Sequence, residues 1–122
     1  MIFCKRVYDQ REAQDGCRVL VDRLWPRGLT REKAAIDEWV KDAAPSGSLR
    51  AWYGHRPERW PEFQSRYLLE LEKEGAAQAL ERLRTYAAAG NVTLLTATRH
   101  VEQSHAAVLA SVLKKARGRA GS

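Results

Sequence analysis

The chain has 122 residues, of which 44% are hydrophobic and 30% are charged. These values are typical of a soluble globular protein, and they predict a single domain over residues 1–117 with a flexible C-terminal tail over residues 118–122. No apolar run approaches the roughly 20 residues that span a bilayer, and the N-terminus lacks the apolar segment of a signal peptide. We therefore expect no membrane association and a cytoplasmic location.

Lysine and arginine together number 21 against 15 aspartates and glutamates, which gives a formal net charge of +6. This excess of positive charge is compatible with binding of nucleic acid or of smaller anions, but it establishes neither. The two cysteines, Cys4 and Cys17, are too few for a disulfide framework and lack metal-ligand spacing. No P-loop, dinucleotide fingerprint or nucleophile elbow is present, so we expect no metal and no cofactor.

The first part of the chain predicts two strands around a polar turn. Residues 2–8 are rich in strand-forming residues, residues 9–16 are polar and end in Asp15-Gly16, and residues 18–24 hold a near-continuous apolar run. The polar segment is too short for a crossover helix, so the first two strands can pair as neighbours. The second strand favours an interior position that is covered on both faces.

Short helices are predicted next. Thr30 can cap a helix that runs to about Ile36, and Ser46 can cap another that reaches Tyr53. Between them, residues 37–44 fit either a strand or a helix.

The second half alternates helices with a strand. Apolar residues at helical spacing predict helices over residues 60–71 and 76–89, the latter ended by Gly90. A buried strand over residues 91–97 and a final helix follow. The inner face of that helix carries Val101, His105, Val108, Leu109, Val112 and Leu113. This alternation predicts an α/β fold, with a small, mostly parallel sheet flanked by helices in a three-layer, Rossmann-like arrangement.

Parallel sheets bind ligands at the carboxyl ends of their strands, and charged residues follow two predicted strands here. Arginine recognises phosphate or carboxylate through paired hydrogen bonds, and a nearby aspartate can orient the guanidinium or act as a base. We therefore predict ligand-binding roles for Arg23, Trp25, Arg27 and Arg99, and an acid–base role for Asp22. The alternative is an Asp–Arg pair that only stabilises the end of a strand.

Two histidines are further candidates. His105 lies on the inner face near the start of the last helix, where it can act as an acid, a base or an anion ligand, or can be a hydrogen-bonded core histidine. His55 follows Trp52-Tyr53-Gly54 among arginines, a composition that suits a stacking platform for bases and makes His55 a candidate ligand-binding residue. Trp52 and Tyr53 fit the core of a short helix equally well.

The string Asp-Arg-Leu-Trp-Pro-Arg-Gly is highly specific, and it stands among several strings that point to one family. They are Cys4 to Asp9, Asp15 to Gly28 with its Asp-Arg-Leu-Trp-Pro-Arg-Gly, Asp37-Glu38-Trp39, Ala44-Pro45-Ser46, Trp52-Tyr53-Gly54-His55 and Val92 to Leu95. Across nearly its whole length the chain resembles the DUF488 family of bacterial proteins, in its short YeaO-like branch. The resemblance implies an α/β domain of unknown function.

The chain departs from this family after the last predicted strand. Arg99-His100 stands where the resemblance implies a Lys-Asp-like pair, so the acidic partner is missing. The broader family often carries a Cys-His-Arg string near the start of the following helix, which aligns with Ser104-His105-Ala106 and leaves no thiol nucleophile here.

The leading hypothesis is therefore a domain that binds a small anionic ligand, with a phosphate or carboxylate group, at the strand ends, with or without acid–base catalysis. One alternative is a nucleic-acid-binding or regulatory module that uses a basic face, for which we expect binding that weakens steeply with salt. Another is an interaction protein whose apolar face pairs subunits. The sequence leaves the oligomeric state and the question of enzymatic activity open.

Overall fold

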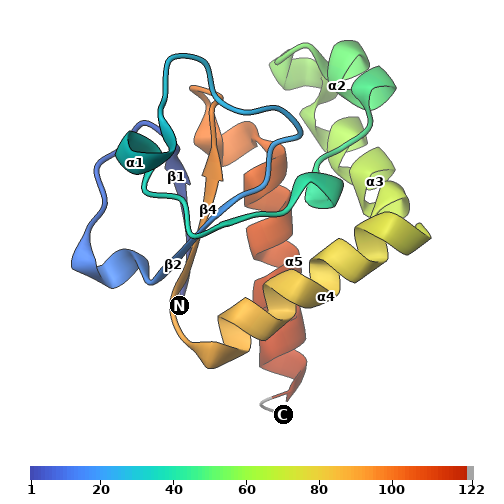
Figure 1. Cartoon of the computed structure of the whole chain (residues 1–122). Helices are drawn as coiled ribbons and strands as arrows, with labels where there is room; N and C mark the ends of the chain where they lie inside the picture. The colour runs from blue at the N-terminus through green and yellow to red at the C-terminus, as the bar shows by residue number, and fades with distance from the viewer. Residues whose placement is uncertain (121–122) are drawn as a thin grey trace.

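The structure is a computed structural model that describes the backbone of residues 1–120 and the side chains of residues 1–115. Within these residues one sheet carries helices on both faces (Figure 1). The strands are β1 (Ile2–Arg6), β2 (Cys17–Leu20), β3 (Glu38–Trp39) and β4 (Val92–Thr96). The helices are α1 (Arg31–Ala34), α2 (Gly47–Tyr53), α3 (Trp60–Glu70), α4 (Glu74–Ala89) and α5 (His105–Ala120). Short 3-10 turns lie at η1 (Ala13–Asp15), η2 (Lys41–Ala43), η3 (Pro57–Arg59) and η4 (Val101–Gln103).

The strands form one parallel sheet in the order β1-β4-β2-β3. The expectation that the first two strands pair as neighbours is wrong, because β4 lies between them. Leu94 of β4 is in register with Cys4 on one side and with Val19 on the other. All five residues of β4 are buried. β4, in which every residue is buried, thus occupies a position with a strand on each side and side chains on both faces.

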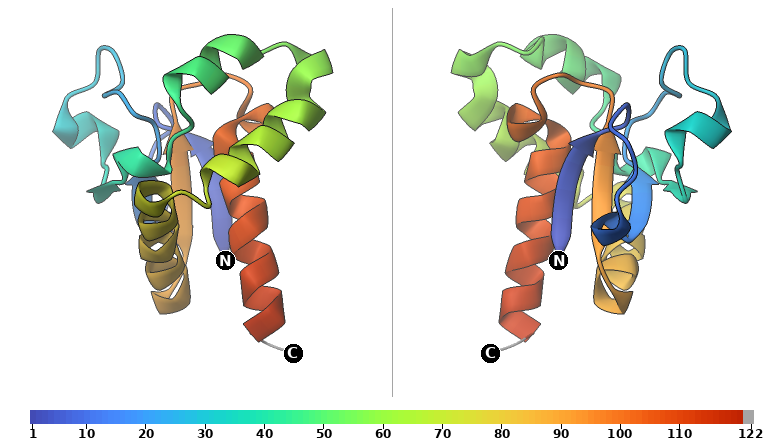
Figure 2. Two further views of the ribbon diagram at one scale, coloured as in Figure 1. Left: turned by 90° about the vertical axis from the view of Figure 1, so that its right-hand side faces the viewer. Right: turned by 90° about the vertical axis from the view of Figure 1, so that its left-hand side faces the viewer.

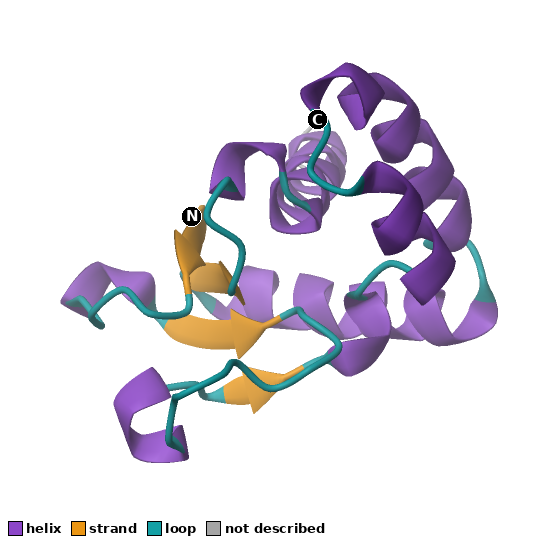
Figure 3. Cartoon of the chain, turned by 90° about the horizontal axis from the view of Figure 1, so that it is seen from above, coloured by secondary structure: helices purple, strands orange, loops and turns teal. Residues whose placement is uncertain are grey.

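The helices are distributed unequally over the two faces of the sheet (Figures 2 and 3). Side chains from α2, α3, α4 and α5 pack with Val19 and Leu94 in the larger core. The opposite face carries a smaller core, in which Leu20 and Leu95 meet Ala34 of α1. The predicted α/β fold with a sheet flanked by helices is confirmed, with one helical layer much thicker than the other.

A buried ion pair lies on the thinly covered face. Arg18 of β2 is 1% exposed, and its Nη1 lies 2.7 Å from Oδ2 of Asp15. Its other nitrogens donate to the backbone carbonyls of Asp9, Ala34 and Ala35. A guanidinium is tolerated in an interior only when partners satisfy its donors. Arg18 therefore ties β2 to η1 and α1, and four of its five N–H donors are used inside the fold.

Local sequence signals explain several element boundaries. The hydroxyls of Thr30 and Ser46 accept backbone N–H groups in the first turns of α1 and α2, as predicted. Residues 37–44 divide into the short strand β3 and the turn η2. The predicted tail, residues 118–122, falls partly on the end of α5, and residues 121–122 lie outside the described residues. Its flexibility stays a prediction.

Candidate functional site

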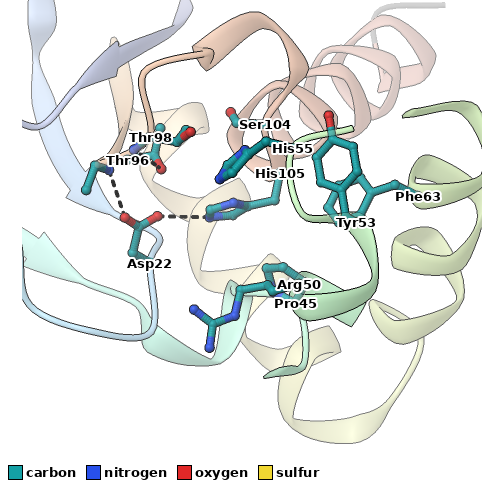
Figure 4. A pocket seen from close by; sticks show the side chains of 11 residues that line it. Asp22, Pro45, Arg50, Tyr53, His55, Phe63, Thr96, Thr98, Ser104 and His105 are labelled. Atoms are coloured by element: carbon teal, nitrogen blue, oxygen red, sulfur yellow. Dashed lines mark hydrogen bonds and ion pairs between the residues drawn. The ribbon is translucent and has the colours of Figure 1, made fainter. Parts of the chain in front are cut away.

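A cavity opens at the carboxyl end of the sheet, between the neighbouring strands β2 and β4. After β2 the chain crosses to the face covered by α1, whereas after β4 it continues into α5 on the opposite face. Adjacent strands whose connections leave in opposite directions form a switch point, where open α/β sheets bind ligands. The cavity measures about 370 Å³ (Figure 4). It is lined by Asp22, Pro45, Arg50, Tyr53, His55, Phe63, Thr96, Ala97, Thr98, Ser104 and His105.

A second cavity of about 330 Å³ shares part of this lining. Asp22, Arg50, Ala97 and His105 border both cavities, so the two are halves of one crevice. We call the first the aromatic half, after Tyr53, His55 and Phe63. We call the second the arginine half, after Arg23 and Arg27. The arginine half is also lined by Tyr8, Leu24, Trp25, Pro26 and Ala44.

Asp22 stands at the boundary between the two halves. The backbone continues the β2 ladder for one more residue, since the Val21 N–H donates to the Leu95 carbonyl at 3.1 Å, and Asp22 follows directly. Its Oδ2 accepts the backbone N–H of Ala97 at 2.8 Å, which joins the loops after β2 and β4. Burial alone would raise the pKa of Asp22. Hydrogen bonds and the attraction of His105 outweigh that effect and lower the pKa, so Asp22 is a carboxylate at neutral pH.

His105 is the first residue of α5 and faces Asp22 (Figure 4). Its Nε2 lies 3.1 Å from Asp22 Oδ1 and 3.0 Å from the carbonyl oxygen of Val21. Both neighbours are acceptors, so Nε2 carries a proton in the neutral and in the charged ring. The His105 side chain is 12% exposed and hydrogen-bonded, and it lines both cavities. Its role as an acid, a base or an anion ligand stays a prediction.

Three arginines border the crevice. Arg23 and Arg27, both predicted, line the arginine half, and Arg50 of α2 lines both halves. All three are exposed, and within the described residues none forms a salt bridge with a carboxylate. Arg23 donates to the carbonyl of Ala44 at 3.3 Å. Asp22 is the one carboxylate in the lining of the two halves, so the arginine half is positively charged.

The remaining predictions divide between the site and the structural core. Trp25 lines the arginine half, but its Nε1 donates to the Leu29 carbonyl at 2.8 Å and its ring packs edge-on against Trp39. Arg99 is exposed and is not among the residues that line either cavity. Arg50 was missed as a site residue, because its position depends on the placement of α2 over the strand ends and no local motif reports that placement.

Aromatic side chains form the other end of the crevice. Tyr53 and Phe63 stack with ring centroids 4.4 Å apart, and the ring of His55 lies 5.9 Å from that of Tyr53. The Tyr53 hydroxyl donates to the Gln103 carbonyl at 2.8 Å, which fixes its orientation. His55 has a positive φ of 56°, in the left-handed region that non-glycine residues seldom adopt. Such conformations are concentrated at functional sites, because the surrounding structure must hold them.

No thiol adjoins the Asp22–His105 pair in the described residues. Cys4 on β1 directs its Sγ to the Ala106 carbonyl at 3.4 Å, and burial raises its pKa to about 11, so it is scarcely ionised at neutral pH. Ser104 precedes His105, but its hydroxyl donates to the Val101 carbonyl at 2.6 Å. Among residues 1–120 no group of three or more histidine, cysteine, aspartate or glutamate side chains is placed to hold a metal ion.

Comparison with known proteins assigns the chain to a family. The profile of the family described as "Inactive DUF488-N3 subclade" matches residues 1–121. The chain belongs to the DUF488 family. An uncharacterized protein of Mycobacterium tuberculosis (strain H37Rv) is 51% identical over 108 residues, which are 88% of this chain and 89% of that protein. The uncharacterized protein YeaO of Escherichia coli (strain K12) is 43% identical over 116 residues, or 93% of this chain and 96% of that protein. No solved structure matches the chain.

Membership of DUF488, and similarity to YeaO, confirm the resemblance drawn from the sequence strings. The most specific of those strings, Asp22 to Gly28, supplies Asp22 and one wall of the arginine half of the crevice. In the part of this DUF488 chain that the structure describes, every helix is too short or too polar to cross a membrane.

Proposed function

We propose that this protein is a binding domain for a small organic anion, which carries a phosphate or carboxylate group and occupies the crevice between β2 and β4. The observation that carries the proposal is the set of Arg23, Arg27 and Arg50 around one cavity, with no carboxylate paired to them in the described residues. Arginines that a fold needs for stability are normally paired, as Arg18 is. Exposed arginines around a concavity are available to a phosphate or carboxylate.

The Asp22–His105 pair contributes in a different way. The Asp22 carboxylate would repel an anion, but His105 lies against it at 3.1 Å and offsets that charge when protonated. The pair also holds the loops after β2 and β4 in place, through the Ala97 N–H and the Val21 carbonyl. In the proposed function Asp22 and His105 therefore set the shape and charge of the crevice floor.

Binding without turnover is the form of the proposal that the chemistry favours. The family is described as an inactive subclade. Ser104 stands where the broader family often carries a cysteine, and its hydroxyl is occupied by the Val101 carbonyl. A proton-transfer pair without an adjoining nucleophile can position a ligand, but it lacks the group that would form a covalent intermediate.

The nucleic-acid alternative has less support from the surface. Trp52 of α2 lies close to two arginines, and a base would need one of its ring faces. The guanidinium of Arg66 lies 4.4 Å from the ring centroid, and that of Arg59 lies 5.0 Å from it. Since Trp52 already has cation–π partners, a small anion in the crevice is the better-supported ligand.

Titration with inorganic phosphate, followed by backbone NMR of the full chain at low ionic strength, tests the proposal. We expect saturable shifts of the Arg50, Ala97 and His105 amides. Arg50→Ala should weaken binding roughly 10- to 100-fold, because hydrogen bonds to charged groups contribute about 1.5–3 kcal/mol. Arg84→Ala is the charge-matched control, since Arg84 pairs with Glu81 on α4, and it should leave the affinity unchanged. Absence of saturable shifts with phosphate and with acetate would refute the proposal.

A further inference from the structure

The crevice has two chemically different ends, and this difference bears on the class of ligand. The arginine half presents Arg23 and Arg27, whereas the aromatic half is walled by Tyr53, His55 and Phe63. Arg50, Asp22 and His105 lie between them. An inorganic anion would occupy only the first half and would leave a cavity of about 370 Å³ beside it.

We infer that the ligand is a planar aromatic or heteroaromatic ring that carries a phosphate or carboxylate group, as a nucleotide does. This inference rests on the proposed function and extends it. The anionic group contacts Arg23, Arg27 and Arg50, and the ring lies in the aromatic half against Pro45, Tyr53 and His55. The two cavities together, about 370 and 330 Å³, fall in the range typical of sites for such ligands, roughly 300–1,000 Å³.

His55 gives the strongest indication that the aromatic half is built for a ligand. It is exposed and yet is held at a φ of 56°, directly after Gly54 at a φ of 51°. Two successive left-handed residues turn the chain sharply after α2 and direct the His55 ring toward the cavity (Figure 4). A glycine would adopt this backbone more easily than a histidine. The requirements of folding therefore do not explain why an imidazole stands at this position.

The neighbouring aromatics make the wall rigid. Tyr53 is anchored by its hydroxyl to the Gln103 carbonyl, and Phe63 stacks on Tyr53 from α3. Both are nearly fully buried, with exposed fractions of 6% and 2%. A wall with few free rotamers loses little conformational entropy when a ligand packs against it, and aromatic side chains favour a planar ring through stacking.

A pair of probes that differ only in the ring tests the inference. Methyl phosphate and phenyl phosphate carry the same charge, and their affinities for the full chain can be measured by calorimetry and by the NMR titration above. Stacking on aromatic side chains makes phenyl phosphate bind about 10-fold tighter than methyl phosphate, with ring-current shifts at His55 and Tyr53. Adenosine 5′-monophosphate should bind at least as tightly as phenyl phosphate.

The variant His55→Gly separates the ring contribution from folding. Glycine suits the left-handed backbone at this position, so the variant should keep the thermal stability of the parent chain. It should bind methyl phosphate normally and lose most of the preference for phenyl phosphate. Equal affinities for the two phosphates in the parent chain, or a preference unchanged in His55→Gly, would overturn the inference and leave the proposed function standing. Failure of both phosphates to bind would refute the proposed function itself.

Discussion

Replacing Asp22 with asparagine tests whether the Asp22–His105 pair holds the crevice floor together. The carboxylate accepts the Ala97 N–H at 2.8 Å and faces His105 Nε2 at 3.1 Å. The asparagine oxygen can keep the Ala97 bond, but its NH2 group then faces the proton on Nε2. The variant loses one charge-assisted contact and weakens another, which costs about 2 kcal/mol. For a chain of this size that corresponds to a fall in Tm of roughly 6–10 °C.

The dependence on pH identifies the charge as the cause. Because the pKa of Asp22 is lowered in the folded state, the carboxylate stabilises the fold above its unfolded-state pKa of about 3.9. That contribution disappears as the pH falls through the lower, folded-state value. Urea unfolding of the parent chain and of Asp22→Asn should therefore differ by about 2 kcal/mol at pH 5, and the difference should shrink steadily between pH 4 and pH 3.

A surface carboxylate supplies the control for this experiment. Asp42 is exposed on η2, and Asp42→Asn should change the free energy of unfolding by less than about 0.5 kcal/mol at either pH. If Asp22→Asn destabilises the chain equally at pH 5 and pH 3, its effect comes from shape and the electrostatic reasoning is wrong. If it has no effect at pH 5, the Asp22–His105 contact does not stabilise the fold.

Three further predictions concern the rest of the molecule. Arg18→Ala should lower the free energy of unfolding by about 3–5 kcal/mol. It removes the buried guanidinium from Asp15, which keeps only Lys5 as a charged partner, and it leaves the carbonyls of Asp9, Ala34 and Ala35 without that donor. Urea denaturation measures this, and a loss below about 1 kcal/mol would contradict the assigned role. Gly16→Ala should destabilise the chain by more than about 2 kcal/mol, which is in the upper range for ordinary substitutions. A Cβ at Gly16 would lie 2.1 Å from the Asn91 carbonyl oxygen, and the φ of Gly16 is 64°. A Tm equal to that of the parent chain would refute this prediction. Cys4, with its pKa raised to about 11, should react with a thiol reagent at pH 8 many times more slowly in the folded chain than in urea, and equal rates would show that it is accessible and ionised.

The sequence by itself determined the local elements and the family. Thr30 and Ser46 cap helices by bonds within their own first turn, and the spacing of Trp60, Phe63 and Tyr67 specifies one helical face. These signals depend on residues at most a few positions apart, so they can be read without the fold. The string from Asp22 to Gly28 identified DUF488 and marked the strand end that lines the crevice.

Tertiary structure decided how these parts meet. The order of the strands depends on which apolar strand gains most from burial on both faces, a comparison across the whole chain, and so β4 displaced the expected pairing of β1 with β2. Asp22 and His105 could each be named as candidates from the sequence. The two residues are 83 positions apart, and their contact follows from the parallel register of β2 and β4. Arg50 joins them because α2 packs over the strand ends, whereas Arg99, two residues beyond Ala97 in the sequence, stays outside the cavity lining. The sequence shows which residues have suitable chemistry. Whether their side chains meet in one crevice depends on the packing of segments that are far apart in the sequence.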